Sequence, residues 1–312
     1  MKSLKLILTF FLGFAIFTGC EECEETVETS NGTPFEAPTA QEFNALQLNV
    51  YQNLVQTARL DVANGINFIS AAGVTLFIPP DCLIANGTVV TGFVDLEFFE
   101  VFDRGDLLTT NTTTVGQLPT GELDLLISGG AFYINASQNG QPIDLICEGF
   151  LGIPTDLSGG DDIEMRPFDG TLDANGNLLW TEANRFLEID GGPQGSTYFT
   201  SIASFGWFNV DKFANDPRPT TAVQVSIPQE FNQENTAVYL ALVGEPNSLA
   251  YLYGELPIGL EAYFIFISEE NGDFRYAIKT VTIEENQQLI FTRQETEVVN
   301  LSEITAIINA LP

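Results

Sequence analysis

Apolar and polar residues alternate with a period of two through much of this chain, and Asn-Gly pairs interrupt the alternation. Two such runs are Gly73–Pro80, which stops at a double proline, and Ala131–Ala136. Asn-Gly pairs stand at Asn86, Asn139 and Asn271. A period of two is typical of a strand with one buried face, and Asn-Gly favours the two-residue turn of a hairpin. The sequence therefore predicts an all-β body.

Further strands are expected on both sides of a proline-containing segment. Before it, Val89–Phe99 is expected to form one continuous strand. After it, strands are expected at Val223–Ile227, Ala237–Val243, Ala262–Ile267, Arg275–Ile283 and Leu289–Arg293. Pro217 and Pro219 separate the two sets, which places a boundary near residue 218. Turns spaced by about ten residues are typical of β-sandwiches. We expect two tandem β-sandwich-like domains, 61–218 and 219–312.

Helical spacing occurs at two places. Between Gln41 and Leu60, apolar residues recur at intervals of three and four, which predicts an amphipathic helix; the alternative is a strand that starts within 55–62. These residues are Phe43, Leu46, Val50 and Leu54. The second place is Leu301–Leu311, where Ser302 is the expected N-cap of a short C-terminal helix.

The first residues carry the features of an export signal. Lys2 and Lys5 precede an uncharged apolar run from Leu6 to Phe17. This run is too short for a membrane-spanning helix, which needs about 20 residues, and suits the core of a secretory signal. We expect residues 1–19 to be a cleaved signal peptide.

The end of this run resembles the lipobox of bacterial lipoproteins. It reads Phe17-Thr18-Gly19-Cys20, with Phe17 where Leu is usual. The resemblance implies cleavage before Cys20 and acylation of Cys20 with chains such as palmitate, which would anchor the protein to a membrane. The alternative is an ordinary signal peptide that is cleaved elsewhere.

An acidic run, Glu21-Glu22-Cys23-Glu24-Glu25, follows Cys20 directly. It resembles the surface-export signal of Bacteroidota lipoproteins, which implies a position in the outer membrane facing the cell exterior. The alternative is a solvated spacer. Residues 20–60 are expected to be a lipid-anchored acidic tether that includes the predicted helix.

The chain is strongly acidic, with 42 Asp and Glu against 11 Lys and Arg and a net charge of −31. This charge repels nucleic acid and anionic lipid surfaces, so we expect no nucleic-acid partner and a membrane contact made through the lipid alone. It favours cationic partners or divalent ions; the alternative is an adaptation for solubility.

The chain contains no histidine. This excludes Ser-His-Asp and Cys-His catalysis, histidine-ligated zinc and haem bound by a proximal histidine. Besides Cys20, the cysteines are Cys23, Cys82 and Cys147. In an exported chain, Cys82 and Cys147 can form a disulfide that closes a loop of about 65 residues. The alternative is two buried free thiols.

A family resemblance covers about a quarter of the chain. Residues 73–101 read GVTLFIPPDCLIANGTVVTGFVDLEFFEV, and residues 128–145 read SGGAFYINASQNGQPIDL. They resemble a ZU5-type β-sandwich domain in the form found in Bacteroidota lipoproteins. The resemblance implies an interaction module, without the autoproteolytic His-Phe-Ser site of some relatives. Residues 205–213 (FGWFNVDKF) are similar to a Gly-Trp-Ile-Asn-Cys-Asp-Arg-Phe signature of the same lipoproteins, which have no assigned activity.

Oxygen-bearing side chains gather between residues 169 and 177. They are Asp169, Asp173, Asn175 and Asn177. Calcium binds six to eight oxygens, so these residues are a candidate calcium site, although the closing glutamate of an EF-hand is missing. A hairpin tip is the alternative explanation. The acidic loop Gly159–Asp162 is a second candidate for a cation.

Two further patterns have a structural and a functional interpretation. Asp95 and Glu97 share one face of an expected strand, as the carboxylates of a glycosidase do. Trp180 and Trp207 either stack on a carbohydrate or fill a core.

Together these features predict a cell-surface lipoprotein that acts as a non-catalytic binding or structural module for a protein or glycan partner. The alternative is a carboxylate-based hydrolase acting on an extracellular polymer. We expect no cofactor, with calcium as the alternative.

Overall fold

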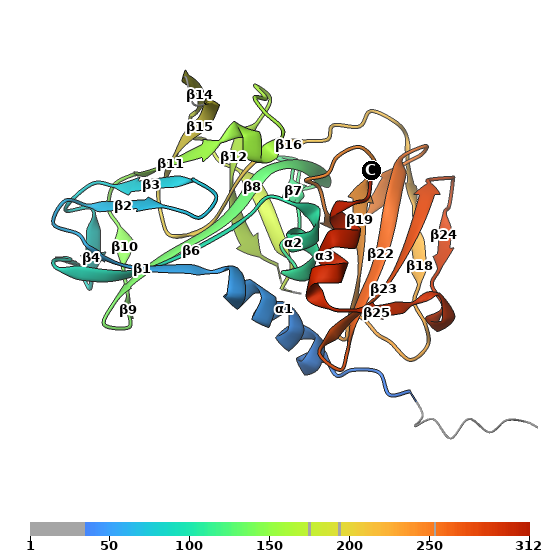
Figure 1. The fold of residues 1–312 in the computed structure, drawn as a ribbon. Helices are drawn as coiled ribbons and strands as arrows, with labels where there is room; N and C mark the ends of the chain where they lie inside the picture. The colour runs from blue at the N-terminus through green and yellow to red at the C-terminus, as the bar shows by residue number, and fades with distance from the viewer. Residues whose placement is uncertain (1–34, 174–175, 193–194, 253) are drawn as a thin grey trace, which may run out of the picture. The chain divides into compact units, whose positions relative to one another are not determined.

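The computed structural model describes residues 35–173, 176–192, 195–252 and 254–312, which are coloured in Figure 1. Strands dominate this part of the chain, and the last element is a short helix. The predictions of a mostly β body and of a short C-terminal helix are therefore confirmed. The expected signal peptide, Cys20 and the acidic run after it lie outside the described residues. No helix among the described residues is long and apolar enough to cross a bilayer.

The largest sheet has eight strands and is mostly antiparallel. Its order is β1 (Gln56–Asp61), β6 (Phe93–Val101), β8 (Leu123–Gln138), β16 (Gly206–Phe213), β12 (Arg166–Leu172), β13 (Leu178–Glu182) and β7 (Val115–Gln117), with β9 (Gln141–Pro142) paired to the end of β8. The long strand β8 also pairs with β7, the last strand of this order. This pairing closes β8, β16, β12, β13 and β7 into a small five-stranded barrel, whereas β1 and β6 extend from it.

A five-stranded sheet shares a hydrophobic core with the largest sheet. Its order is β14 (Leu187–Gly192), β15 (Gly195–Ile202), β11 (Gly149–Pro154), β3 (Thr75–Ile78) and β2 (Ile66–Ile69). Alternate residues of β6 and β3 point into this core, among them Leu96, Phe98 and Leu76. The short strands β10 (Asp144–Leu145), β4 (Leu83–Ala85) and β5 (Thr88–Val89) form a third sheet, and the 3-10 turn η1 (Thr155–Ser158) follows β11.

The C-terminal part contains a second five-stranded sheet. Its order is β20 (Ala250–Tyr251), β19 (Thr236–Leu242), β22 (Glu261–Glu270), β23 (Asp273–Thr282) and β25 (Glu297–Val299). Two strand pairs accompany it: β17 (Thr220–Ala222) with β21 (Glu255–Pro257), and β18 (Gln224–Ser226) with β24 (Gln288–Ile290). The 3-10 turn η2 (Arg293–Glu295) precedes β25.

Three helices are described. Helix α1 (Ala40–Leu54) starts in a capping box between Thr39 and Glu42, and β1 begins two residues after it ends. The helix and the strand that the sequence offered as alternatives are therefore both present, one after the other. The short helix α2 (Arg104–Thr109) was not expected.

Helix α3 (Leu301–Asn309) corrects one prediction at the C-terminus. Its N-cap is Asn300 and not Ser302, because the Asn300 side chain accepts from the Glu303 main-chain N–H while the Glu303 side chain accepts from that of Asn300. This reciprocal capping box satisfies two N–H groups that a helix start leaves unpaired.

The three predicted Asn-Gly hairpins are confirmed. Asn86, Asn139 and Asn271 have φ of 51°, 52° and 55°, and each following glycine is also in the left-handed region. These pairs join β4 to β5, β8 to β9 and β22 to β23. One strand prediction was wrong: Val89–Phe99 is divided because Gly92, at φ +80°, separates β5 from β6.

Residues Glu36–Pro312 form one compact unit, and a second hydrophobic cluster joins its parts. This cluster contains Phe43 of α1, Leu107 of α2, Ile265 of β22 and Ile304 of α3. Helices α2 and α3 approach closely, because Gly105 has no side chain: a Cβ there would lie 2.7 Å from the Thr305 carbonyl oxygen. The Gly105 N–H donates to the Asn309 side-chain oxygen at 2.7 Å.

Candidate functional site

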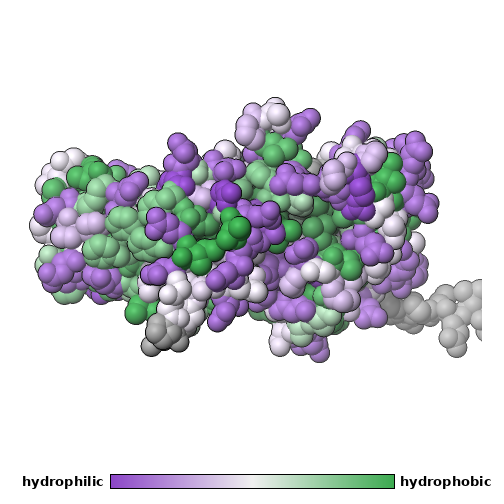
Figure 2. Space-filling view, turned by 90° about the horizontal axis from the view of Figure 1, so that it is seen from above, coloured by the Kyte–Doolittle hydropathy of each residue, from purple (hydrophilic) through white to green (hydrophobic). Residues whose placement is uncertain are grey.

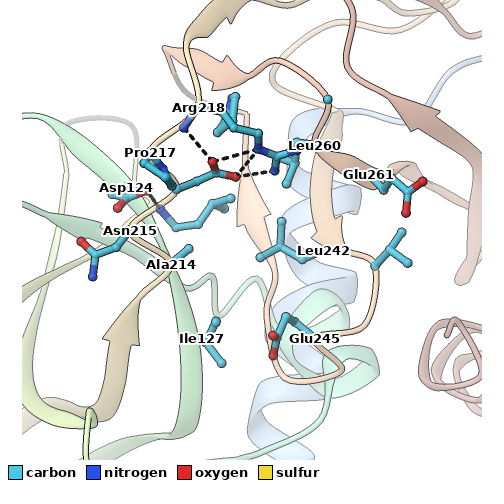
Figure 3. A pocket seen from close by; sticks show the side chains of 15 residues that line it. Asp124, Ile127, Ala214, Asn215, Pro217, Arg218, Leu242, Glu245, Leu260 and Glu261 are labelled. Carbon is cyan, nitrogen blue, oxygen red and sulfur yellow. Dashed lines mark hydrogen bonds and ion pairs between the residues drawn. The ribbon is translucent and has the colours of Figure 1, made fainter.

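Two pockets are the main candidates for a functional site. The first, here called the acidic pocket, has a volume of about 540 Å³ and is drawn in Figure 3. It lies between the start of β8, the segment that follows β16 and the β21–β22 connection. Its lining includes four carboxylates and one cation: Asp124, Asp216, Glu245, Glu261 and Arg218.

The cation of the acidic pocket is bound by one of its carboxylates. The Arg218 Nε donates to both oxygens of Asp216, at 2.9 and 3.0 Å, and the Arg218 main-chain N–H donates to the same carboxylate at 3.0 Å. The guanidinium holds the pKa of Asp216 below its usual range. Asp124 shows the opposite effect, because burial raises its pKa. The pocket thus combines one carboxyl whose pKa is raised with one whose pKa is lowered.

The second pocket, here called the amide pocket, is larger, at about 760 Å³. Helix α1, the turn after α2 and strands β18, β19 and β20 contribute to its wall. Of the sixteen described residues that line it, only Glu234 is charged. Five carry primary amides: Asn44, Gln47, Asn111, Asn177 and Gln233. A lining of this kind offers many hydrogen-bond donors and acceptors with little charge.

A chain of hydrogen bonds fixes the inner wall of the amide pocket. The Gln47 side-chain nitrogen donates to the Tyr239 hydroxyl at 3.2 Å, and that hydroxyl lies 2.8 Å from the Asn111 side-chain oxygen, to which it donates. Gln47 is 7% exposed and Tyr239 is 1% exposed. Burial raises the pKa of Tyr239 far above neutrality, so its phenol stays protonated and can donate to Asn111.

The residues of the predicted calcium site have different partners. Arg185 binds both Asp169 oxygens at 2.8 Å, whereas Asp173 accepts from the main chain and the side chain of Asn177 at 2.9 and 3.1 Å. The structure thus brings Asp173 and Asn177 together at the β12–β13 turn; Asn175 lies outside the described residues. Among the described residues, no group of three or more acids or cysteines is arranged to hold a metal ion.

The acidic residues of the other two candidates also have partners. In the loop after η1, Asp161 accepts from the Thr155 hydroxyl at 2.8 Å, and Asp162 forms an ion pair with Lys212 at 2.7 Å. Asp95 and Glu97 are exposed on one face of β6, as expected. Asp95 lies 3.7 Å from an Arg59 nitrogen, and Glu97 accepts from Asn135 at 3.2 Å.

Cys82 and Cys147 are joined by a disulfide, with their Cα atoms 5.3 Å apart. Cys82 directly precedes β4, and Cys147 follows β10. These two strands pair with each other, so the bond joins segments that are already adjacent. Cys82 lies in the first hydrophobic core.

Trp180 lies in the second hydrophobic cluster, and the partly buried Trp207 packs against it. Trp180 is fully buried, and its indole N–H donates to the Thr113 carbonyl at 2.7 Å. Its ring meets that of Trp207 edge to face, with centroids 6.3 Å apart. Trp180 therefore fills the core and presents no face to a carbohydrate.

A row of phenylalanines lies on the five-stranded sheet that contains β11 and β15. Phe150 stacks between Phe77 and Phe199, with ring centroids 6.4 and 5.7 Å apart, and Phe186 lies 5.8 Å beyond Phe199. Phe77, Phe186 and Phe199 are each close to 40% exposed. Figure 2 shows hydrophobic residues over this part of the molecule.

Sequence reasoning missed the amide pocket, although one signal of it was present. Gln47 stands at helical spacing from Phe43 and Val50, so it interrupts the apolar face of α1 with an amide. A polar residue on a buried face needs a hydrogen-bond partner. That partner, Tyr239, lies 192 residues away and has no local sequence signature.

Comparison with known proteins finds no matching family model, no matching curated protein and no matching solved structure.

Proposed function

We propose that the protein is a lipid-anchored lipoprotein on the outer face of the outer membrane, and that its body binds a partner without catalysing a reaction. The Gly19-Cys20 junction and the acidic run after it support the location. The ZU5-type resemblance supports an interaction module in the first of two sandwich-like units, 61–218. The strand pattern after Pro217 and Pro219 supports the second unit, 219–312.

The observation that carries the binding function is the lining of the amide pocket. Binding sites are concave, are lined mainly by apolar groups and use a few fixed polar groups for orientation. Here Val225, Ile227 and Leu252 supply apolar surface, and the Gln47–Tyr239 hydrogen bond fixes polar groups at the inner wall. General acid–base chemistry needs a titratable group, and Glu234 is the only charged residue among the described residues of this lining. The pocket is therefore suited to recognition.

The exposed phenylalanine row gives additional support, because exposed apolar patches commonly mark interaction sites.

The test is to incubate the purified full chain with the surface polymers of the cells that make it, and to follow retention and product release together. We expect retention without release of new reducing ends, new amino termini or free acids. Release of products by the purified chain would contradict the proposal.

The alternative is a carboxylate-based hydrolase that acts on an extracellular polymer, and the acidic pocket favours it. Asp124 has a raised pKa and Asp216 a lowered one, as an acid and a base in one site would require. If this alternative holds, Asp124→Asn abolishes product release, whereas Asn49→Ala, on α1 outside both pockets, leaves it unchanged.

A further inference from the structure

The amide pocket differs in charge from the protein that contains it. The chain carries a net charge of −31, and the acidic pocket is lined by five charged residues. Among its described lining residues the amide pocket has one charged side chain, Glu234, and the raised pKa values of Tyr239 and Tyr251 keep both phenols neutral. No cation in this lining can hold an anionic ligand, and no pair of acids can hold a cationic one. The lining therefore selects an uncharged polar ligand.

The hydrogen-bonding groups that line the pocket come from four separate segments. Asn44 and Gln47 lie on α1, Asn111 follows α2, Asn177 precedes β13 and Gln233 precedes β19. A primary amide has one acceptor oxygen and two donor hydrogens. Three of these amides use part of that capacity within the protein: Gln47 and Asn111 bond to Tyr239, and Asn177 donates to Asp173. Sugar hydroxyls both donate and accept, so amides from several segments can engage the hydroxyls around a sugar ring.

The apolar part of the lining matches the other property of a sugar, whose ring presents C–H faces. Val225, Ile227, Val238 and Leu252 line the pocket beside the ring of Tyr251. Aromatic and aliphatic surface packs against such faces while the amides bind the hydroxyls.

We propose that the amide pocket binds a short neutral glycan. The inference rests on the proposed binding function and specifies its ligand. A peptide is less favoured, because extended peptides are commonly bound by adding a strand to a sheet edge. Here the amides belong to side chains from four segments. The volume of about 760 Å³ lies within the usual range of ligand pockets, roughly 300–1,000 Å³.

The test uses the full acylated chain in a zwitterionic detergent, because sugar-headed detergents would compete for the pocket. The chain is applied to an array of neutral oligosaccharides of glucose, galactose, mannose and xylose. Sulfated and uronic-acid oligosaccharides and uncharged decapeptides form the other arms. We expect binding to at least one neutral glycan and none to the anionic ones. The dissociation constant of the strongest binder is then measured by calorimetry.

Two exposed amides of the lining provide variants that should leave the fold intact. Asn44→Ala and Gln233→Ala each remove one hydrogen-bonding group, so we expect the dissociation constant to rise about three- to tenfold in each. The matched control is Asn49→Ala, which removes an exposed amide from the same helix at a position outside the pocket. Its dissociation constant should equal that of the unchanged chain.

Each other outcome overturns the inference in a distinct way. Decapeptide binding that weakens in Asn44→Ala identifies a peptide site, so the glycan is wrong while the binding function stands. If neither Asn44→Ala nor Gln233→Ala weakens glycan binding, the glycan binds outside the amide pocket. Absence of binding to every neutral glycan also rejects the inference. Cleavage of an array glycan that is lost in Asp124→Asn rejects the proposed function itself.

Discussion

The buried guanidinium of Arg104 donates to the main-chain carbonyl of Leu242 at 2.9 Å, across 138 residues of sequence. It also donates to the carbonyls of Glu245 and Leu311, at 2.7 and 3.3 Å, and it lies 5.8 Å from the ring centre of Tyr263. Arg104 is 1% exposed, and burial lowers its pKa. One side chain from α2 thus joins the end of β19, the following turn and the segment after α3.

Replacing Arg104 should destabilise the body strongly. Arg104→Met leaves three carbonyls without this donor in a buried site, so we expect the free energy of unfolding to fall by about 3 kcal/mol or more. Urea unfolding of the purified chain measures the change. The control is Arg59→Met, whose exposed ion pair with Asp95 should contribute less than about 1 kcal/mol. Equal effects of the two substitutions would show that Arg104 does not hold these segments together.

The disulfide should contribute a large part of the stability. Its cysteines are 65 residues apart, a separation for which constraint of the unfolded chain is worth about 4 kcal/mol. We expect reduction to lower the melting temperature of the unchanged chain to that of the Cys82→Ala, Cys147→Ala double variant. Reductant should leave the double variant unaffected. A melting temperature that reduction does not change in the unchanged chain would refute the bond.

Stability should decrease from mildly acidic to neutral pH, partly because of Asp211. This carboxyl is buried in β16, where it accepts from the Gly129 N–H at 3.2 Å and from the Asn209 amide at 2.6 Å. Burial raises its pKa well above the usual range and raises the pKa of Asp106 to about 6. Both groups ionise near pH 4 in the unfolded chain. Unfolding therefore releases protons above about pH 4, and the free energy of unfolding falls as pH rises through the folded pKa values.

Asp211→Asn isolates the contribution of this one group. Relative to the unchanged chain, the variant should gain stability steadily as pH rises from 4 to 7, as measured by urea midpoints at each pH. Asp216→Asn should change stability in the opposite direction, because Arg218 lowers the pKa of Asp216. Above about pH 4 the unchanged chain is stabilised by the ionised Asp216, and the variant should lack that stabilisation. A constant difference between Asp211→Asn and the unchanged chain would contradict a raised pKa.

Cys20 should carry the lipid. In Cys20→Ser we expect the protein to lose acyl labelling and to leave the membrane fraction, because no acyl chains would remain to hold it. Cys23→Ser, three residues further along, is the matched control and should keep both properties. Persistent labelling of Cys20→Ser would show that the lipobox resemblance is misleading.

The acidic run after Cys20 should direct the protein to the cell surface. Changing Glu21, Glu22, Glu24 and Glu25 to Ala should preserve acylation but protect the body from protease added to intact cells. Unchanged cleavage would mean that the run is only a spacer.

Local chemistry explains which parts of the fold could be predicted. The Asn-Gly hairpins at Asn86, Asn139 and Asn271 depend on a left-handed conformation that the residue types themselves favour. Helix α1 was predictable because its apolar spacing has one period throughout. The strand break at Gly92 was missed because the β-branched and aromatic residues on both sides of the glycine favour strand equally.

The pockets depend on distant pairs, which explains why local patterns did not reveal them. In the sequence Tyr239 is an ordinary strand residue. Its hydrogen bonds with Gln47 and Asn111 are visible only in the folded structure. The calcium prediction relied on the residue types within one turn. Arg185, which binds the Asp169 carboxylate, lies 16 residues from it, outside that turn. Arg104 likewise gave no sign of burial, because its partners are main-chain carbonyls.

The close approach of Gly105 to Asn309 has a consequence for the order of folding. These residues are 204 positions apart, so α2 cannot find its partner until α3 has left the ribosome or a translocation pore. Until then the surface of α2 that α3 will cover stays open, and such exposed apolar surface is prone to aggregate. The α2–α3 contact can therefore form only after residue 309 has been synthesised.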